Sequence, residues 1–344
     1  SRNLINSDKS IPKRCVWNYA PFLRYRYKMS RRSSVSADYS GRSSQPSLAQ
    51  LQPVADNSNP LRVVQGNPNL APSFRHSLRL RFQKFWQETQ QSLNITLDGD
   101  MTQNAIITKT TFDDATGGRY TTYENINGVW NARLSTLFGR PLGRRKLWSV
   151  NSNLSLSASQ GIGYNNGERN VTSMLTLRLS PSVAYRPEDL EIELRPNWQF
   201  QKTYYSLDRL ANRTVHHYGG SFYATWYAKF GLVLATDLHF NAARGYASGY
   251  NDDEWMWNAS VSYQFLSRRQ ATITLKGYDL LQMRSNVNHT VTANYVDDSR
   301  FTSLTRYFML TFTYKINTLG RGHGGRRGEG HGGGRRGSRR LSRE

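Results

Sequence analysis

The chain has 344 residues, with 46 Lys or Arg against 24 Asp or Glu, so its formal net charge is +22. Hydrophobic residues make up 37%, and no stretch approaches the ~18–20 consecutive apolar residues of a transmembrane helix, which excludes a helical membrane protein. Aromatic residues reach 12%, which argues against wholesale disorder, and a single cysteine, Cys15, excludes an internal disulfide or a cysteine-based zinc site. The sequence begins at Ser1 without a methionine or a signal peptide, so we expect a mature form or a fragment.

Apolar and polar residues alternate along most of the chain, as in residues 77–83, where Leu and Phe alternate with Arg. Successive residues of a strand point to opposite faces, so each such stretch predicts a strand with one apolar and one polar face. Many of the expected strands run ten or more residues, whereas strands of soluble proteins usually have ~5–6. A short helical turn is expected within 48–54. We expect about thirteen strands, at residues 16–29, 33–43, 73–86, 92–112, 119–138, 147–162, 170–186, 189–206, 213–229, 231–247, 254–267, 270–294 and 301–317.

The connections between these strands alternate in character. One set is short and basic, and the other is often longer and rich in Asp, Asn and Gly. Outer-membrane barrels show this asymmetry, with short periplasmic turns and longer outer loops. The short set is 30–32, 139–146, 186–188, 229–231 and 267–269, and the other is 45–72, 113–118, 165–169, 248–254 and 297–299.

The width of such a sheet indicates which face meets which solvent. About eight strands already suffice to fill a barrel interior with side chains, so thirteen long strands enclose a wider space. The apolar face is therefore expected to meet lipid and the polar face a wet lumen. Aromatic residues near the expected strand ends fit the girdles of a membrane barrel: Trp17, Tyr19, Phe85, Trp86, Trp148, Trp226, Tyr227, Trp255 and Tyr307. The fold class predicted is all-β, a transmembrane antiparallel β-barrel.

Residues 45–72 form a loop of 28 residues with five prolines. Loops of this length are uncommon in compact domains and are often functional, and the prolines stiffen the backbone. Two interpretations remain open: a structured outer loop that contacts ligand, or a lid that only seals the barrel. The candidate ligand-binding residues are Gln45, Gln52, Asp56, Asn57, Asn59 and Arg62 of the loop, with Arg79 and Arg81 of the lumen wall.

The run Gly66-Asn67-Pro68-Asn69-Leu70-Ala71-Pro72 resembles the "GNPxLxPE" signature in barrels of TonB-dependent receptors, with Ser73 in place of the glutamate. Residues 45–61, 277–281 and 306–314 also resemble the receptor-like outer-membrane barrel family of Gram-negative bacteria. The resemblance covers roughly residues 16–317 and implies the C-terminal part of a 22-strand barrel. Receptors of this family carry an N-terminal plug and a TonB box, and this chain shows neither.

The resemblance implies active uptake of a nutrient ligand, with the TonB complex acting on a plug missing from this chain and with outer-membrane lipid around the barrel. Two alternatives stay open. One is a passive porin or structural outer-membrane barrel. The other is a soluble basic β protein that binds RNA through the Arg/Gly tail.

The tail at 320–344 holds eight Arg and two Glu, so +6 of the charge lies there. It lacks aromatic residues for base stacking, so we do not expect a nucleic-acid partner. No nucleophile elbow, phosphate loop or dinucleotide fingerprint occurs, and we expect no enzyme activity, cofactor or metal. The expected organisation is an N-terminal segment of an outer loop at 1–15, a barrel at 16–319, and a disordered Gly/Arg-rich tail at 320–344.

Overall fold

The computed structural model describes residues 17–56, 61–113, 116–208, 210–245, 253–266, 269–283, 287–291, 296–300 and 306–316. Its elements are β1 (Phe22–Ser30), β2 (Ser33–Ser44), α1 (Leu48–Leu51), β3 (Ala55–Asp56), β4 (Arg62–Gln65), β5 (Ser73–Trp86), β6 (Gln91–Gln103), β7 (Ala105–Asp113), β8 (Gly118–Ile126), β9 (Val129–Leu142), β10 (Trp148–Asn165), β11 (Glu168–Tyr185), β12 (Leu190–Tyr205), β13 (Arg213–Tyr227), β14 (Leu232–Arg244), β15 (Asp253–Phe265), β16 (Ala271–Tyr278), β17 (Val287–Val291), β18 (Val296–Arg300) and β19 (Tyr307–Tyr314).

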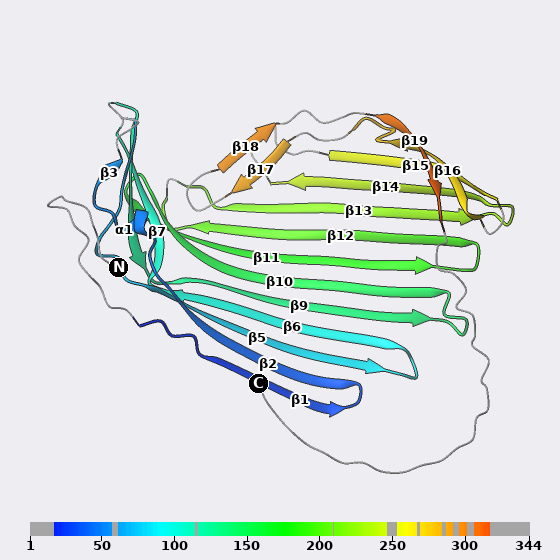
Figure 1. Ribbon diagram of the computed structural model, residues 1–344, viewed down its shortest axis with the longest axis horizontal. Helices are drawn as coiled ribbons and strands as arrows, with labels where there is room; N and C mark the ends of the chain where they lie inside the picture. The colour runs from blue at the N-terminus through cyan, green and yellow to red at the C-terminus, as the bar shows by residue number, and fades with distance from the viewer. Residues whose placement is uncertain are drawn as a thin grey trace, which may run out of the picture.

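Within the described ranges, thirteen strands form one sheet in the order β1-β2-β5-β6-β9-β10-β11-β12-β13-β14-β15-β16-β19. All neighbours in this sheet are antiparallel, and the sheet curves into an open trough that does not close on itself (Figure 1). The thirteen strands predicted from period two are confirmed. None of the described helices is long and apolar enough to cross a membrane.

Three insertions interrupt this meander, all between strands that are neighbours in the sheet. The first is α1 with β3 and β4, the second is the β7–β8 hairpin, and the third is the β17–β18 hairpin. β3, β4, β8 and β7 form a separate four-stranded sheet in which β4 pairs with β8 in parallel. The short turns lie at the opposite end of the trough from this small sheet (Figure 1). The predicted sorting of short and long connections to opposite ends therefore holds.

Three of the predicted strands are each divided in two. The stretch 92–112 contains β6 and β7, separated by Asn104 in the left-handed region at φ 50°, and 119–138 contains β8 and β9, separated at Gly128 with φ 101°. The stretch 270–294 is broken between β16 and β17, where Asp279 and Gln282 have positive φ. A left-handed residue turns the chain out of the ladder, so alternation on both sides does not guarantee one continuous strand.

The structure also decides one predicted connection and one predicted helical turn. The connection predicted at 297–299 lies inside β18, which pairs with β17, so that connection is wrong. The helical turn predicted within 48–54 is confirmed as α1, where Ser47 and Gln50 form a capping box. The segments 1–15 and 320–344 lie outside the described residues.

Candidate functional site

The outer, convex face of the main sheet is apolar. Direct cross-strand neighbours on five successive strands are Leu80, Leu97, Leu134, Leu156 and Leu177. The first four of these leucines are 36%, 38%, 38% and 40% exposed. A contiguous row of large apolar side chains with this exposure marks a surface that an apolar environment covers.

The concave face carries an alternating row of charges. Directly paired residues across β1, β2, β5, β6 and β9 are Arg24, Asp38, Arg79, Asp98 and Arg133. Arg24 Nε lies 2.6 Å from Asp38 Oδ1, and Arg79 Nε lies 2.5 Å from Asp98 Oδ1. These pairs are partly exposed, so each contributes at most ~1 kcal/mol to stability. Their main effect is on charge: the positive charges of Arg24 and Arg79 are each balanced by a neighbouring carboxylate.

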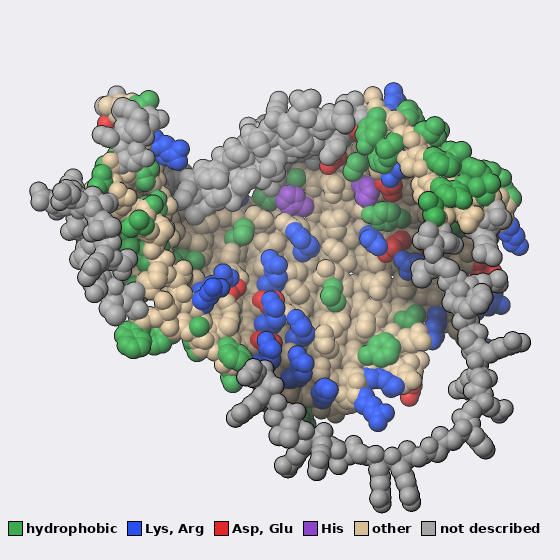
Figure 2. All heavy atoms as spheres, in the orientation of Figure 1, with side chains coloured by type: hydrophobic (Ala, Val, Ile, Leu, Met, Phe, Trp, Pro, Cys, Tyr) green, Lys and Arg blue, Asp and Glu red, His purple; other side chains and the backbone are tan. Residues whose placement is uncertain are grey.

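Lys and Arg side chains form a band across this concave face, where hydrophobic side chains are scattered (Figure 2). A hollow of ≈ 550 Å³ lies over β1, β2, β5 and β6, and its lining includes Arg26 and Arg81 beside the ion-paired residues. At its edge Asp100 accepts hydrogen bonds from Arg75 and Ser77. Charged and hydroxyl side chains therefore dominate the hollow, which suits a hydrated ligand.

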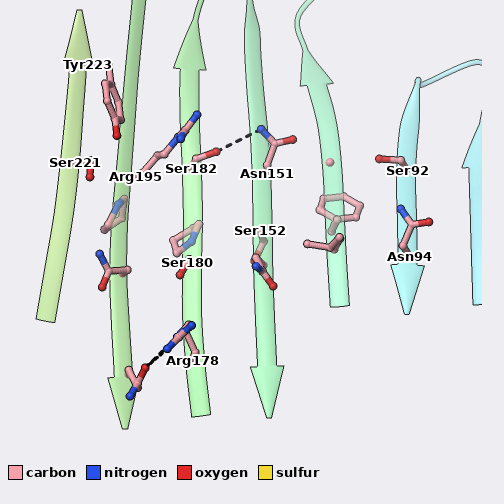
Figure 3. Close-up of a pocket in the computed structure, with 18 of the residues that line it drawn as sticks. Ser92, Asn94, Asn151, Ser152, Arg178, Ser180, Ser182, Arg195, Ser221 and Tyr223 are labelled. Atoms are coloured by element: carbon pink, nitrogen blue, oxygen red, sulfur yellow. Dashed lines mark hydrogen bonds between the residues drawn. The ribbon is translucent and has the colours of Figure 1, made fainter. Parts of the chain in front are cut away.

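A larger hollow of ≈ 1010 Å³ lies over β6 and β9–β13 (Figure 3). Amide and hydroxyl side chains dominate its lining, together with Arg178, Arg195, His217 and Tyr223. Arg178 donates two hydrogen bonds to Gln199 Oε1, at 3.0 and 2.5 Å. The lining holds no Asp or Glu. Its residues are: Ser92, Asn94, Leu137, Phe138, Gly139, Asn151, Ser152, Asn153, Arg178, Ser180, Pro181, Ser182, Arg195, Pro196, Asn197, Gln199, His217, Ser221 and Tyr223.

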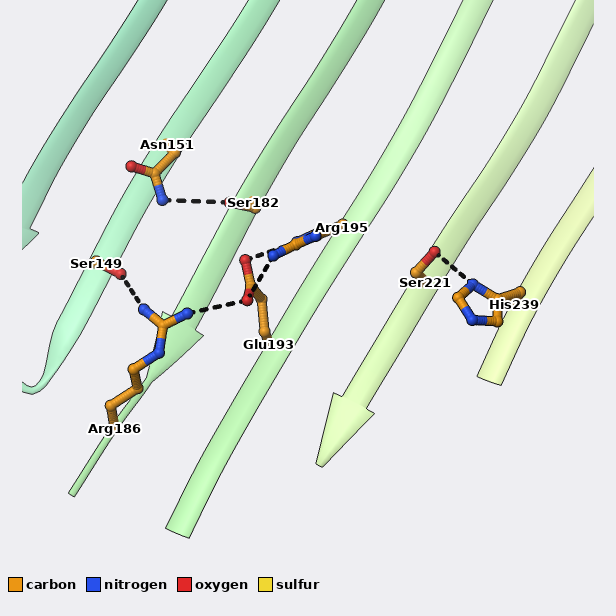
Figure 4. A network of polar contacts seen from close by, with 8 residues as sticks. All are labelled: Ser149, Asn151, Ser182, Arg186, Glu193, Arg195, Ser221 and His239. Atoms are coloured by element: carbon orange, nitrogen blue, oxygen red, sulfur yellow. Dashed lines mark hydrogen bonds and ion pairs between the residues drawn. The ribbon is translucent and has the colours of Figure 1, made fainter. Parts of the chain in front are cut away.

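Next to this hollow, one carboxylate holds two guanidinium groups (Figure 4). Glu193 accepts from Arg195 at 2.7 and 2.9 Å and from Arg186 at 3.0 Å, and its side chain is 13% exposed. Arg195 also lies over the ring of Tyr223, at 5.2 Å from its centroid. The network fixes these long side chains to the wall and keeps the hollow open.

Ser221 and His239 form a second polar contact on this face, at 2.9 Å between Oγ and Nδ1 (Figure 4). His239 Nε2 lies 3.2 Å from Asp237 Oδ2, which also accepts from Asn258. Ser, His and Asp occur together in nucleophilic triads. Ser221, however, lies inside β13, which is paired with a strand on each side, so the backbone N–H groups around it are hydrogen-bonded within the sheet. The contact therefore lacks backbone donors for an oxyanion, and we interpret it as a structural link between β13 and β14.

The long loop folds tightly upon itself. Gly66 N donates to Gln52 O at 2.9 Å, and Asn67 N donates to Gln50 O at 2.7 Å. A Cβ on Gly66 would lie 2.4 Å from Gln52 O, so only glycine fits without a shift of the backbone. Leu70 is 1% exposed and anchors the segment. Close backbone approach thus explains the glycine of the signature.

The loop also docks onto the β7–β8 hairpin. Asn67 donates to Tyr123 O at 2.9 Å, and Tyr120 donates its hydroxyl proton to Gln65 Oε1. Asn125 accepts from Ala71 N at 2.7 Å and donates to Ala71 O at 3.0 Å. Two segments far apart in the sequence therefore form one packed cap at this end of the sheet.

Aromatic side chains gather at the ends of the strands, as predicted. At the short-turn end the Trp148 and Tyr185 rings lie 4.6 Å apart, and Lys84 lies over Trp86. At the other end the Phe240 and Trp255 rings lie 4.5 Å apart. This arrangement is typical of the two interfacial girdles of a membrane barrel.

A family model described as the outer membrane protein beta-barrel family matches residues 2–314. The chain belongs to this family. Comparison with curated proteins and with solved structures found no match. The family places the barrel in the bacterial outer membrane, so its convex leucine row meets lipid and its concave charged face meets the lumen.

The structure separates the predicted ligand residues of this barrel into groups. Gln45 donates to Asn18 Oδ1 at 2.7 Å, and Gln52 uses its backbone to hold Gly66. Arg62 is exposed on β4 next to β8. Arg79 and Arg81 lie on the concave face of β5, away from the cap. Asn57 and Asn59 lie outside the described residues, as does the side chain of Asp56.

The sequence did not lead us to the lining of the larger hollow or to the pair of hydrogen bonds between Asn125 and Ala71. Both depend on strand register, because they bring together side chains from strands distant in sequence. The alternating Asn and Ser residues of 147–162 were the available signal for the hollow. Among the described residues, no group of three or more His, Cys, Asp or Glu could hold a metal ion.

Proposed function

We propose that this chain forms the barrel wall and outer loops of a receptor that takes up a nutrient ligand actively, driven through TonB. The observation that carries the proposal is the Gly66–Pro72 segment, which resembles the receptor signature. The structure gives that segment a definite role, because it ties a long loop onto the β7–β8 hairpin. A stiff cap above a polar lumen is suited to a ligand that is first captured and then admitted.

The directions of the edge strands support a larger barrel. In the described sheet, β1 and β19 are first and thirteenth in an antiparallel series, so they run the same way. Single-chain bacterial barrels have an even number of antiparallel strands, so an odd number of further strands must lie between these two edges. A 22-strand receptor barrel leaves nine strands, which is odd. The proposal thus assigns this chain to the C-terminal part of such a barrel.

In this function the chain contributes binding and passage, and we propose no catalytic residue in it. The plug and its contact with TonB belong to a part of the receptor beyond this chain. We propose that the predicted residues Gln45, Gln52, Asp56, Asn57, Asn59 and Arg62, with Arg79 and Arg81, bind the ligand.

Nutrient-limited growth tests the proposal. Cells that lack the complete protein are compared with the parent on single limiting nutrient sources, and the source on which they fail is tested again in cells that lack TonB. We expect uptake of that nutrient to fall in both strains and to stop when the proton gradient is dissipated. Uptake that continues without TonB would instead identify a passive porin.

A further inference from the structure

The concave face carries a second row of arginines that differs from the alternating row beside it. Directly paired residues across seven strands, from β1 to β11, are Arg26, Ser36, Arg81, Thr96, Ser135, Ser155 and Arg178. This row lies two residues along each strand from Arg24 and Arg79, roughly 7 Å nearer the short turns. It contains three guanidinium groups and hydroxyl side chains, and no carboxylate.

The two rows differ in how their charges are balanced. Arg79 is paired with Asp98, whereas Arg81 has Ser36 and Thr96 as its cross-strand neighbours. Among the described residues, no ion pair involves Arg26 or Arg81. Arg178 donates two hydrogen bonds to a neutral amide, Gln199. Arg26 and Arg81 therefore carry positive charge that is not ion-paired with a carboxylate of the described residues.

The charge continues toward the short turns. A hollow of ≈ 720 Å³ next to the first turn includes Lys28, Arg31 and Arg32 in its lining and no Asp or Glu. Over β1 and β5, the arginines next to the row on its cap side, Arg24 and Arg79, are ion-paired, whereas cations without a carboxylate line the hollow on its turn side. Low-dielectric walls around a lumen focus the electric field of these cations, which raises the local concentration of anions there.

We propose that Arg26 and Arg81 of this row bind a multiply charged oxyanion, through phosphate or carboxylate groups of the ligand. Arg26 and Arg81 both pair with Ser36, on opposite sides of β2, so their Cα atoms are roughly 10 Å apart. Two long side chains at that separation can each present a planar fork to one charged group of the same molecule. The hydroxyl groups between them supply neutral hydrogen bonds for the rest of the ligand.

This inference names the ligand class of the proposed receptor, but its test does not depend on TonB. The complete protein is purified in an uncharged detergent at low ionic strength, where screening is weak. Binding of inorganic pyrophosphate and of citrate is then measured by calorimetry. We expect at least one to bind the parent protein. Binding of neither would overturn the proposal.

The variants locate the site. Arg26→Gln with Arg81→Gln should weaken binding about tenfold or more, because hydrogen bonds to charged groups are among the strongest. Arg144→Gln with Arg145→Gln, in a turn, removes the same two charges elsewhere and should change affinity less than about twofold. Arg24→Gln with Asp38→Asn removes a neutralised pair and should also have little effect. Equal losses in the controls would show a diffuse field and overturn the assignment.

Two further measurements test whether lost binding comes from misfolding and whether lipid competes for the site. Arg81→Lys keeps the charge but loses the planar fork, so it should weaken binding less than Arg81→Gln does, and a loss as large as that of Arg81→Gln would contradict the electrostatic role. Phosphatidylglycerol added to the detergent should not displace pyrophosphate, because the row faces the lumen. Displacement would place the site on the lipid side and overturn the proposal.

Discussion

Placing an arginine at Leu154 tests how the barrel faces the membrane. Leu154 lies on the convex face of β10, is 40% exposed, and has Thr136 and Leu179 as cross-strand neighbours. It is six residues beyond Trp148, the girdle residue at the short-turn end. At ~3.3 Å per residue and a tilt of ~45°, that is about 14 Å along the membrane normal, near the middle of an apolar band ~25 Å tall. Leu154→Arg should therefore cost ~2–4 kcal/mol of folding free energy.

The neighbouring residue supplies the matched control. Asn153 lies one residue away at nearly the same depth, on the lumen wall beside Leu137 and Ser180. Asn153→Arg should cost less than ~1 kcal/mol because its charge stays in water. Both variants are measured by urea titration of folding into lipid vesicles, with the parent as reference. Equal costs, or a larger cost at Asn153, would refute the assignment of the two faces.

Two other predictions concern the cap and the topology. Gly66→Ala should loosen the loop by ~1–3 kcal/mol, because the new Cβ would meet backbone atoms, and should expose residues 45–72 to limited proteolysis. Gly99→Ala, where nothing lies within 4 Å of the added Cβ, should leave the digestion pattern unchanged. After Cys15 is replaced, an impermeant thiol reagent should label Leu48→Cys in intact cells and should not label Arg144→Cys. Labelling of the turn position alone would reverse the orientation.

The face of each strand could be predicted from the sequence because the side-chain period of a strand is two. Leu80 and Arg81 differ in hydropathy and are adjacent, so their opposite faces follow directly. Strand ends were harder. Asn104 interrupts a long alternating stretch by adopting a left-handed conformation, and the pattern on its two sides gives no sign of that break.

The contents of the site depend on register, which the alternation alone does not supply. Arg79 and Arg81 look equivalent in the sequence. Only the pairing of β5 with β6 places Asp98 opposite Arg79 and Thr96 opposite Arg81, which makes one arginine neutralised and the other available. The docking of Asn67 on Tyr123 joins residues 56 positions apart, so no local pattern could predict it.

Nitroxide scanning along β10 is the most direct test that the convex face meets lipid and the concave face meets water. Single labels at residues 153–158 of the complete protein in lipid vesicles, with Cys15 replaced, are probed with oxygen and with a water-soluble nickel complex. Labels at Leu154, Leu156 and Ala158 should be accessible to oxygen, and those at Asn153, Ser155 and Ser157 to nickel. An alternation with the opposite phase, or nickel access on both faces, would contradict a sheet that spans the outer membrane in this way.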